Sequence, residues 1–147
     1  MSWNIFNFHL INNIYIMKNS YSNIFAFNKK ILKKVINILK KGNIAGLPTE
    51  TVYGVAGNAY SRKPIKKIFK LKGRPNSNPL IIHYLNFDNA KQDIIINNNF
   101  KILYKYFCPG PITFILKRKI SSKISPIACA NLNTVAVRFP KHKILRF

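Results

Sequence analysis

Two short segments hold most of the side chains that could do chemistry. Residues 48–54 read PTETVYG, and residues 72–83 read KGRPNSNPLIIH. Between them they offer hydroxyls, a Lys-x-Arg pair, an amide and an imidazole. Hydroxyls and amides orient small polar molecules, whereas Lys and Arg bind phosphates. The two segments therefore predict a site for a phosphate-bearing ligand with a small polar ligand beside it.

The cationic pair lies where a helix is expected to end. Arg74 has a planar fork that can hold a phosphate through two hydrogen bonds, and Lys72 adds a point charge. Arg74 follows Gly73 and precedes Pro75, so it is expected in a rigid loop. For Lys72 a second explanation stays open, because cations also favour the carboxyl end of a helix.

The remaining candidate residues have structural alternatives when taken alone. Thr49 and Thr51 could serve a ligand or only a turn, since Thr-rich turns are common. His83 closes an apolar run and could equally be a structural histidine. Arg138 ends a predicted strand just before Pro140, a placement that can aim its guanidinium into a cleft.

Charge is the abnormal feature of the composition. The chain has 147 residues, enough for one domain, and its apolar share of 48% is ordinary for a globular protein. Its net charge is +22, with 25 Lys plus Arg against 3 acids. A polyanionic partner such as RNA explains this charge. Drift in an AT-rich genome explains it too, because Lys, Asn and Ile abound and Lys is scattered along the chain.

The Arg residues are informative because the rest of the chain uses Lys as its usual basic residue. An Arg kept where Lys is the default indicates a need for forked donors. The Arg positions are Arg62, Arg74, Arg118, Arg138 and Arg146.

Several function classes are excluded by what the sequence lacks. It has no GxxxxGK[ST] loop and no GxGxxG segment, so ordinary ATPase and Rossmann interpretations fail. With Glu50, Asp88 and Asp93 as its acids, hydrolysis by paired carboxylates is excluded. Cys108 and Cys129 do not form a zinc pattern, and we expect no protein-built metal site.

The distribution of Gly and Pro divides the sequence into two parts. All Gly and Pro residues lie between Gly42 and Pro140, so we expect an extension at 1–27 and a domain at 28–147. Met17 is an alternative start. The apolar run near the amino end is interrupted by Asn residues, so it predicts neither a signal peptide nor a membrane span. We expect a cytoplasmic protein with no membrane partner.

Periodicity predicts a mixed helix and strand order. We expect a helix at 28–41 capped by Asn28, and another at 61–73 whose Ile65, Ile68 and Phe69 face inward. A continuous apolar run at 79–85 predicts a buried strand. Further helices are expected at 87–96 and 98–107, and further strands at 44–47, 112–116 and 134–137. Short connections between such elements predict an α/β or α+β sheet protein.

Four segments in order, PTETVYG, KGRPNSNPLIIH, CPGPIT and TVAVRFP, resemble the YrdC-like family of threonylcarbamoyl-adenylate synthases. The resemblance covers about residues 40–140. It implies a twisted mixed sheet with flanking helices around a basic cavity. It also implies an enzyme that joins L-threonine, bicarbonate and ATP into threonylcarbamoyl-AMP and releases pyrophosphate. The product would feed t6A modification of tRNA, with other tRNA threonylcarbamoylation proteins as partners.

The resemblance also implies roles for individual residues. Mg²⁺ would accompany ATP, which enters as a substrate. Lys72 and Arg74 would act on the phosphates as the catalytic cations. L-threonine would contact Thr51, His83 and Arg138, and ATP would contact Arg74, Asn78 and Thr134.

Two features depart from the family pattern. Cys108 stands where the family usually has Trp, and the chain stops at Phe147 although the family continues through a Ser-x-Asn segment and closing strands. We therefore expect a member that is incomplete at its carboxyl end, with little or no synthase activity. Two alternatives stay open: a non-catalytic basic module that binds double-stranded RNA or tRNA, and an inactive remnant of the synthase.

Overall fold

Two separate small sheets face each other in the computed structural model, which describes residues 24–146. One is an antiparallel hairpin of β1, Ala45–Pro48, and β2, Tyr53–Ala56. The other has the order β3-β5-β4, with β3 at Ile81–His83, β5 at Thr134–Arg138 and β4 at Thr113–Lys117. β5 runs parallel to β3 and antiparallel to β4, so the mixed α/β architecture is confirmed.

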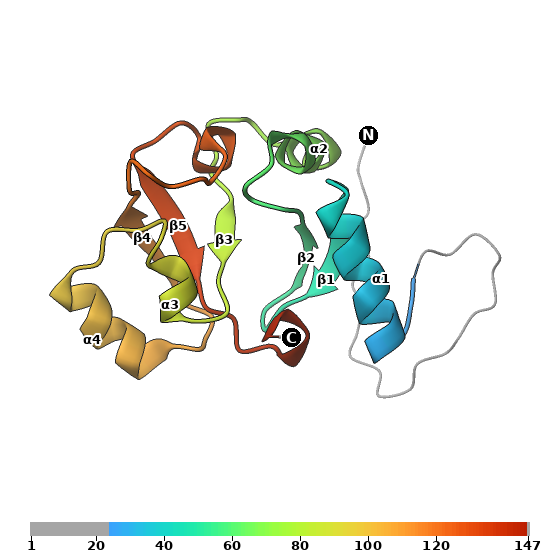
Figure 1. Ribbon diagram of the computed structural model, residues 1–147, viewed down its shortest axis with the longest axis horizontal. Helices are drawn as coiled ribbons and strands as arrows, with labels where there is room; N and C mark the ends of the chain where they lie inside the picture. Colours follow the sequence, from blue (N-terminus) through green and yellow to red (C-terminus); the bar gives the residue numbers. More distant parts are fainter. Residues whose placement is uncertain (1–23, 147) are drawn as a thin grey trace.

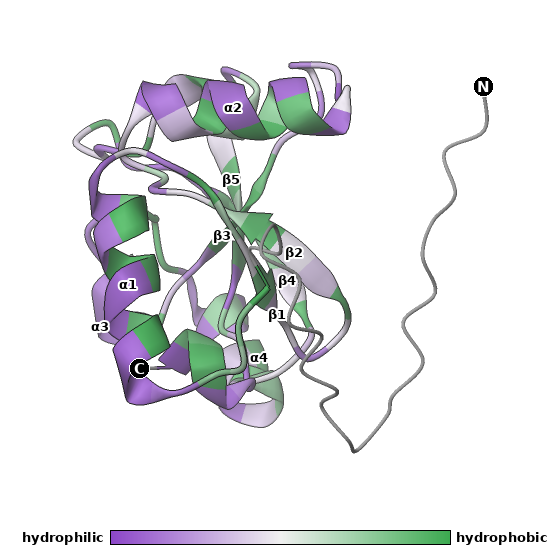
Figure 2. Cartoon of the chain, turned by 90° about the vertical axis from the view of Figure 1, so that its right-hand side faces the viewer, coloured by the Kyte–Doolittle hydropathy of each residue, from purple (hydrophilic) through white to green (hydrophobic). Residues whose placement is uncertain are grey.

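Helix α1, Lys29–Lys40, covers the outer side of the hairpin (Figure 1). The Asn28 side chain accepts a hydrogen bond from the Ile31 amide at 2.9 Å, which confirms the predicted cap. Figure 2 shows hydrophobic and hydrophilic faces on this helix. No residue of α1 is fully buried, so its apolar side only partly leaves solvent.

Helix α2, Arg62–Lys72, lies above the hairpin in the view of Figure 1 and contacts the turn at Pro126–Cys129. Its side chains Ile65, Ile68 and Phe69 are buried, as the periodicity predicts. The helix ends at Gly73, whose φ of 57° is left-handed and therefore favours Gly. Lys72 and Arg74 thus flank a helix terminus, as expected.

The strand predicted at 79–85 is shorter and less buried than expected. β3 covers Ile81–His83, and only Ile82 is buried, whereas Ile81 and His83 are exposed. The reason is position, since β3 is an edge strand of its sheet. One face of the strand packs on the core and the other remains accessible, so the prediction of full burial was wrong.

The helix predicted at 87–96 is also wrong over most of its length. Only α3, Phe87–Ala90, is helical. The chain then turns, and Ile94 forms an isolated bridge with Arg118 beyond the end of β4. A pairing with a residue far along the chain has overridden the local helical pattern.

Asp93 explains why the chain turns there. Its carboxylate is buried and accepts hydrogen bonds from the hydroxyls of Tyr60 at 2.6 Å, Tyr84 at 2.8 Å and Ser122 at 2.7 Å. Burial and the Asp93 carboxylate raise the pKa of Tyr60 to about 12. The cluster ties segments that lie far apart in sequence to the end of β3.

The predicted helix at 98–107 is confirmed as α4, Asn98–Phe107. Asn97 caps it by accepting a hydrogen bond from the Phe100 amide at 2.8 Å. Two short 3₁₀ turns complete the fold, η1 at Pro126–Cys129 and η2 at Lys143–Arg146.

An aromatic cluster fixes the far side of the three-stranded sheet. The ring of Phe100 lies edge-to-face on Phe114 with centroids 5.0 Å apart, and Tyr104 lies likewise on Phe139 at 4.8 Å. Phe139 follows directly on β5 and is fully buried. This packing holds the carboxyl end of β5, where Arg138 lies.

Candidate functional site

A cavity of about 420 Å³ is lined by the hairpin, α2, β3 and β5. Thr51, Lys72, Arg74, His83 and Arg138, all predicted as site residues, line it. No carboxylate is among its lining residues, so the wall that carries these cations is basic. The expected basic cavity is therefore present.

A row of polar residues crosses the three-stranded sheet at one level. His83 of β3 is the register partner of Arg138 of β5, and Arg138 is the partner of Thr113 of β4. Arg138 donates to the Thr113 hydroxyl from Nε at 3.0 Å and from Nη2 at 2.9 Å. The Nε–Nη2 edge of the guanidinium is thereby fixed on Thr113.

Glu50 reaches the same guanidinium from the turn between β1 and β2. Its Oε1 lies 3.7 Å from Nη1 of Arg138, and the side chains are 13% and 15% exposed. Both carboxylate oxygens of Glu50 are inaccessible, and neither has a hydrogen-bond partner among the described residues. The contact is therefore a charge pairing without a hydrogen bond.

The hydroxyl of Thr49 organises the turn that presents Thr51. It donates to the Val52 carbonyl at 2.6 Å and accepts from the Thr51 and Val52 amides at 3.2 and 3.1 Å. These hydrogen bonds stabilise the turn itself, so Thr49 fits the interpretation in which a Thr-rich segment serves the structure of a turn. Thr49 thus shapes the turn, while Thr51 is exposed on the cavity wall.

At the other end of the cavity the Arg74 guanidinium is fixed by hydrogen bonds to its own loop. Its Nη2 donates to the Asn78 side chain at 2.6 Å and to the Pro79 carbonyl at 3.1 Å. Its Nε is buried and has no hydrogen-bond partner among the described residues. Asn78 therefore orients Arg74 and is not itself among the residues lining the cavity.

Thr134, which is also a predicted site residue, lies apart from this arrangement. It begins β5 and pairs with Lys117, at the end of the strand opposite Arg138. It is not among the residues that line the cavity.

His83 carries a perturbed imidazole. Although His83 is exposed along one side at the cavity, desolvation of its ring by the surrounding groups lowers its pKa, and the nearby positive charge of Arg138 lowers it further, while the Ile81 carbonyl and Glu50 act in the opposite direction. The imidazole is therefore biased towards its neutral form. Its Nδ1 lies 3.3 Å from the Ile81 carbonyl, and a proton on Nδ1 would leave Nε2 as an acceptor.

The turn η2 closes one side of the cavity. Leu145 lines it, and Arg146 anchors the turn by donating from Nη1 to the carbonyls of Leu85 at 3.1 Å and Pro140 at 3.2 Å. Arg118 similarly donates to the Ile124 carbonyl at 3.3 Å. Both Arg residues therefore serve the backbone of the fold and not the cavity.

A second cavity, of about 440 Å³, holds none of the predicted site residues. The buried Asp93 carboxylate lies at its base, engaged by the hydroxyls described above. Its lining is Tyr60, Gln92, Asp93, Lys119, Ser121 and Lys123. Over residues 24–146, no group of His, Cys, Asp or Glu is placed to hold a metal ion.

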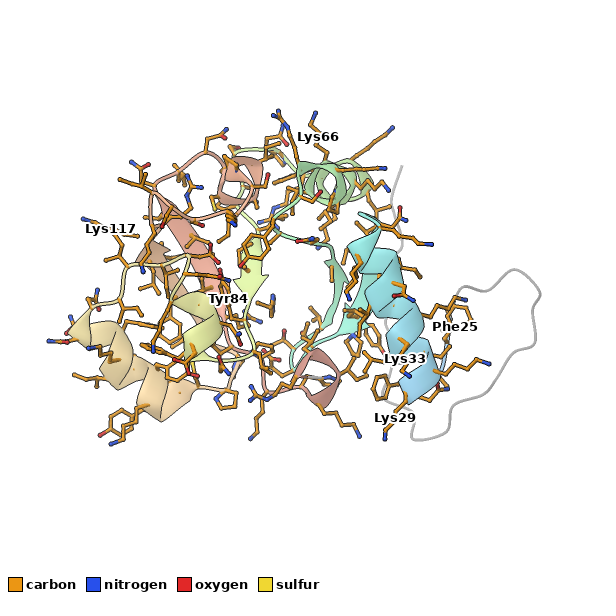
Figure 3. The ribbon with its side chains drawn as sticks, viewed as in Figure 1. Phe25, Lys29, Lys33, Lys66, Tyr84 and Lys117 are labelled. Atoms are coloured by element: carbon orange, nitrogen blue, oxygen red, sulfur yellow. The ribbon has the colours of Figure 1, made fainter. Side chains whose placement is uncertain are left out.

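The positive charge is spread over the surface. Lys29 and Lys33 on α1, Lys66 on α2 and Lys117 on β4 lie at separate edges of the molecule (Figure 3). Scattered Lys residues agree better with compositional drift than with a single RNA-binding stripe. Within the described part of the chain, no helix is long and apolar enough to cross a membrane.

The family model for Sua5, YciO and YrdC, described as "Telomere recombination", matches residues 37–147. The chain belongs to the Sua5/YciO/YrdC family. The match takes in all the motifs that line the cavity, from the hairpin to the turn η2.

Curated relatives in the Sua5/YciO/YrdC family carry the name threonylcarbamoyl-AMP synthase. One from Pyrococcus abyssi is 41% identical over 110 residues, which are 72% of this chain and 31% of the relative. One from Bacillus subtilis is 39% identical over 109 residues, 73% of this chain and 31% of the relative. The chain thus spans about a third of the length of these relatives.

The solved structure of P. abyssi Sua5 complexed with L-threonine matches this fold. The TM-score is 0.77 at 34% identity, over 83% of this chain and 36% of that one. The mixed α/β fold predicted for this family is therefore confirmed, although in the described residues it is divided between two small sheets.

Sequence reasoning did not single out Glu50 or Thr113 as site residues, although both lie within Sua5/YciO/YrdC motifs. Thr113 closes the CPGPIT segment and meets Arg138 only because of strand register. The available signal was its position as a hydroxyl at the start of a predicted strand. For Glu50 the available signal in the sequence was an acidic residue within a motif of a predicted cationic site.

Proposed function

We propose that the cavity binds L-threonine and ATP, and that the chain supplies this part of a site for threonylcarbamoyl-AMP formation. The observation that carries the proposal is the shared cavity of Arg138, His83 and Thr51 with Lys72 and Arg74. The names of the relatives and the L-threonine complex of P. abyssi Sua5 support it.

The sheet end of the cavity suits an amino acid. The Nη1–Nη2 edge of Arg138 can take the α-carboxylate through two parallel hydrogen bonds, because Thr113 engages the Nε–Nη2 edge and leaves the second N–H of Nη2 for the ligand. The hydroxyl of Thr51 and Nε2 of His83 can then bind the polar groups of threonine. Such bonds fix the orientation of the amino acid.

The α2 end of the cavity suits phosphates. Lys72 and Arg74 lie on either side of Gly73, and Asn78 orients the Arg74 fork. In the proposed reaction a carbamate oxygen of threonine, formed with bicarbonate, attacks the α-phosphorus of ATP, and pyrophosphate leaves. Positioning and charge neutralisation carry such a transfer, and both are tasks for these cations.

Three elements of this proposal lie outside the cavity lining, and one of them is Asn78, whose contact with ATP stays a prediction. Mg²⁺ would arrive on the phosphates of ATP, since the described residues form no metal site. Thr134 is proposed to contact ATP from the far end of β5, and that contact stays a prediction. The product would serve t6A modification of tRNA together with other threonylcarbamoylation proteins.

Equilibrium dialysis with labelled L-threonine and labelled ATP tests the proposal. We expect both to bind saturably, and to bind together. Arg138→Ala should weaken threonine binding, and Arg74→Ala should weaken ATP binding. Binding of RNA with neither small molecule bound would overturn the proposal in favour of a basic RNA-binding module, and its affinity would fall steeply with salt.

A further inference from the structure

We propose that Glu50 is a specificity-determining residue: its buried charge makes the Arg138 site select an amino acid zwitterion over a simple carboxylate. The inference rests on the proposed function, since it concerns the same threonine end of the cavity. Among the described residues, Glu50 is the carboxylate that lies against Arg138, the cation proposed to bind the substrate.

The surroundings of Glu50 leave its charge uncompensated by hydrogen bonds. Both oxygens are inaccessible and accept none from the described residues, and the nearest cation found is Nη1 of Arg138 at 3.7 Å. A buried carboxylate normally collects several donors, because desolvation is costly. A charge without hydrogen-bond donors in a protein interior of low dielectric constant interacts more strongly with other charges at a given distance than a charge in water does.

The other acids of the chain cannot take this role. Asp88 is exposed and pairs with Lys91 at 2.6 Å. Asp93 is saturated by three hydroxyls at the second cavity. Since the chain has only 3 acids, Glu50 alone is left to offset the cations of the main cavity.

The field of Glu50 reaches a group on the cavity wall. His83 lines the cavity, and its pKa responds to both charges: Arg138 lowers the pKa and Glu50 raises it. A ligand beside His83 therefore experiences both fields as well. Its negative end is drawn to Arg138, and a positive group is stabilised by Glu50.

This pairing distinguishes ligands by charge. Arg138 alone would bind any small carboxylate, and the positive field of Lys72 and Arg74 would strengthen that tendency. With Glu50 beside Nη1 of Arg138, an anion without an ammonium group meets a partly neutralised site. A zwitterion gains at both of its ends, so the amino group becomes a condition for tight binding.

The test compares L-threonine with 3-hydroxybutyrate, which is threonine without its amino group, by calorimetry at low salt. For the wild-type protein we expect threonine to bind roughly tenfold or more tightly than 3-hydroxybutyrate. In Glu50→Gln the shape and volume stay, the charge is lost, and this ratio should fall by about tenfold. Glu50→Asp retains the charge and should keep most of the preference.

Two measurements serve as controls. Asp88→Asn removes an exposed acid remote from Arg138 and should leave the ratio unchanged. Thermal melts report whether each variant is folded; if Glu50→Gln is not, the wild-type preference and Glu50→Asp decide. The inference is overturned if the wild-type protein binds threonine and 3-hydroxybutyrate equally. It is also overturned if folded Glu50→Gln has the same threonine preference as the wild type. Absence of threonine binding in the wild type would instead overturn the proposed function.

Discussion

Arg138 donates two hydrogen bonds to a single atom, the Oγ1 of Thr113, from Nε at 3.0 Å and from Nη2 at 2.9 Å. The two residues are register partners on antiparallel strands β5 and β4. The guanidinium is thus oriented by the sheet before a ligand arrives, and such preorganisation lowers the cost of binding.

Thr113→Val should therefore weaken threonine binding without unfolding the protein. Valine keeps the shape of threonine and removes the acceptor for both Arg138 bonds. We expect about a tenfold loss in threonine affinity, because hydrogen bonds to charged groups contribute roughly 1.5–3 kcal/mol. Calorimetry measures the loss, and Thr113→Ser, which keeps the hydroxyl, should stay near wild type. Equal affinities for the Val and Ser variants would show that Arg138 is held by other contacts.

Arg74→Lys should reduce ATP affinity by roughly ten- to hundredfold. Lysine keeps the charge but loses the fork that joins Asn78, Pro79 and a phosphate. Equilibrium dialysis with labelled ATP measures the change. Arg62→Lys, at the exposed first residue of α2, is the matched control and should bind ATP as the wild type does. If both variants bind equally well, the guanidinium of Arg74 has no special role.

The pKa of His83 predicts a pH dependence of stability. Folding lowers this pKa below its ordinary value of about 6.5, mainly by burial. As pH falls through about 6.5, the unfolded chain takes up a proton that the folded chain resists, so the free energy of unfolding decreases. His83→Gln removes this contribution and should lose less stability between about pH 7.5 and about pH 5.5.

An NMR titration of the His83 ring checks the same point directly. The account requires a midpoint below about 6.5. A midpoint at or above that value, or equal pH dependence of wild type and His83→Gln, contradicts it.

Gly57 is constrained by close packing between the hairpin and α2. A Cβ at this position would lie 3.0 Å from Cβ of Pro64 and 3.3 Å from Cδ1 of Ile68. We expect Gly57→Ala to lower the free energy of unfolding by about 1–3 kcal/mol. Gly46→Ala is the matched control, because no atom lies within 4 Å of its added Cβ. Urea denaturation of both variants decides, and equal midpoints would contradict the packing argument.

Local patterns predict the helices best where caps and apolar periodicity agree. Helix α2 shows apolar periodicity and a left-handed Gly73 at its end, although the Ser61 side chain makes no capping hydrogen bond. The stretch 87–96 carries a helical pattern too, yet the hydroxyl cluster around Asp93 and the bridge at Ile94 draw the chain away. Those partners lie far along the sequence, so no local pattern contains them.

In the candidate site, too, local contacts can be predicted from the sequence and contacts between distant segments cannot. The PTETVYG segment is recognisable as a turn because Thr49 bonds its own neighbours. The segment runs into β2, which the sequence pattern does not predict, since Tyr53–Ala56 has no fully buried residue. The contacts of Arg138 with Thr113 and Glu50 depend on strand register and on the facing of two sheets, and these arise only in the folded chain.

Binding of L-threonine in the cavity beside Arg138 can be followed by amide NMR spectra recorded during a threonine titration. The account predicts saturable shifts that gather at Thr51, His83, Thr113 and Arg138. The second cavity, sampled by the amide of Gln92, should stay unaffected. No shift at saturating threonine, or shifts gathered at the second cavity, would contradict the account.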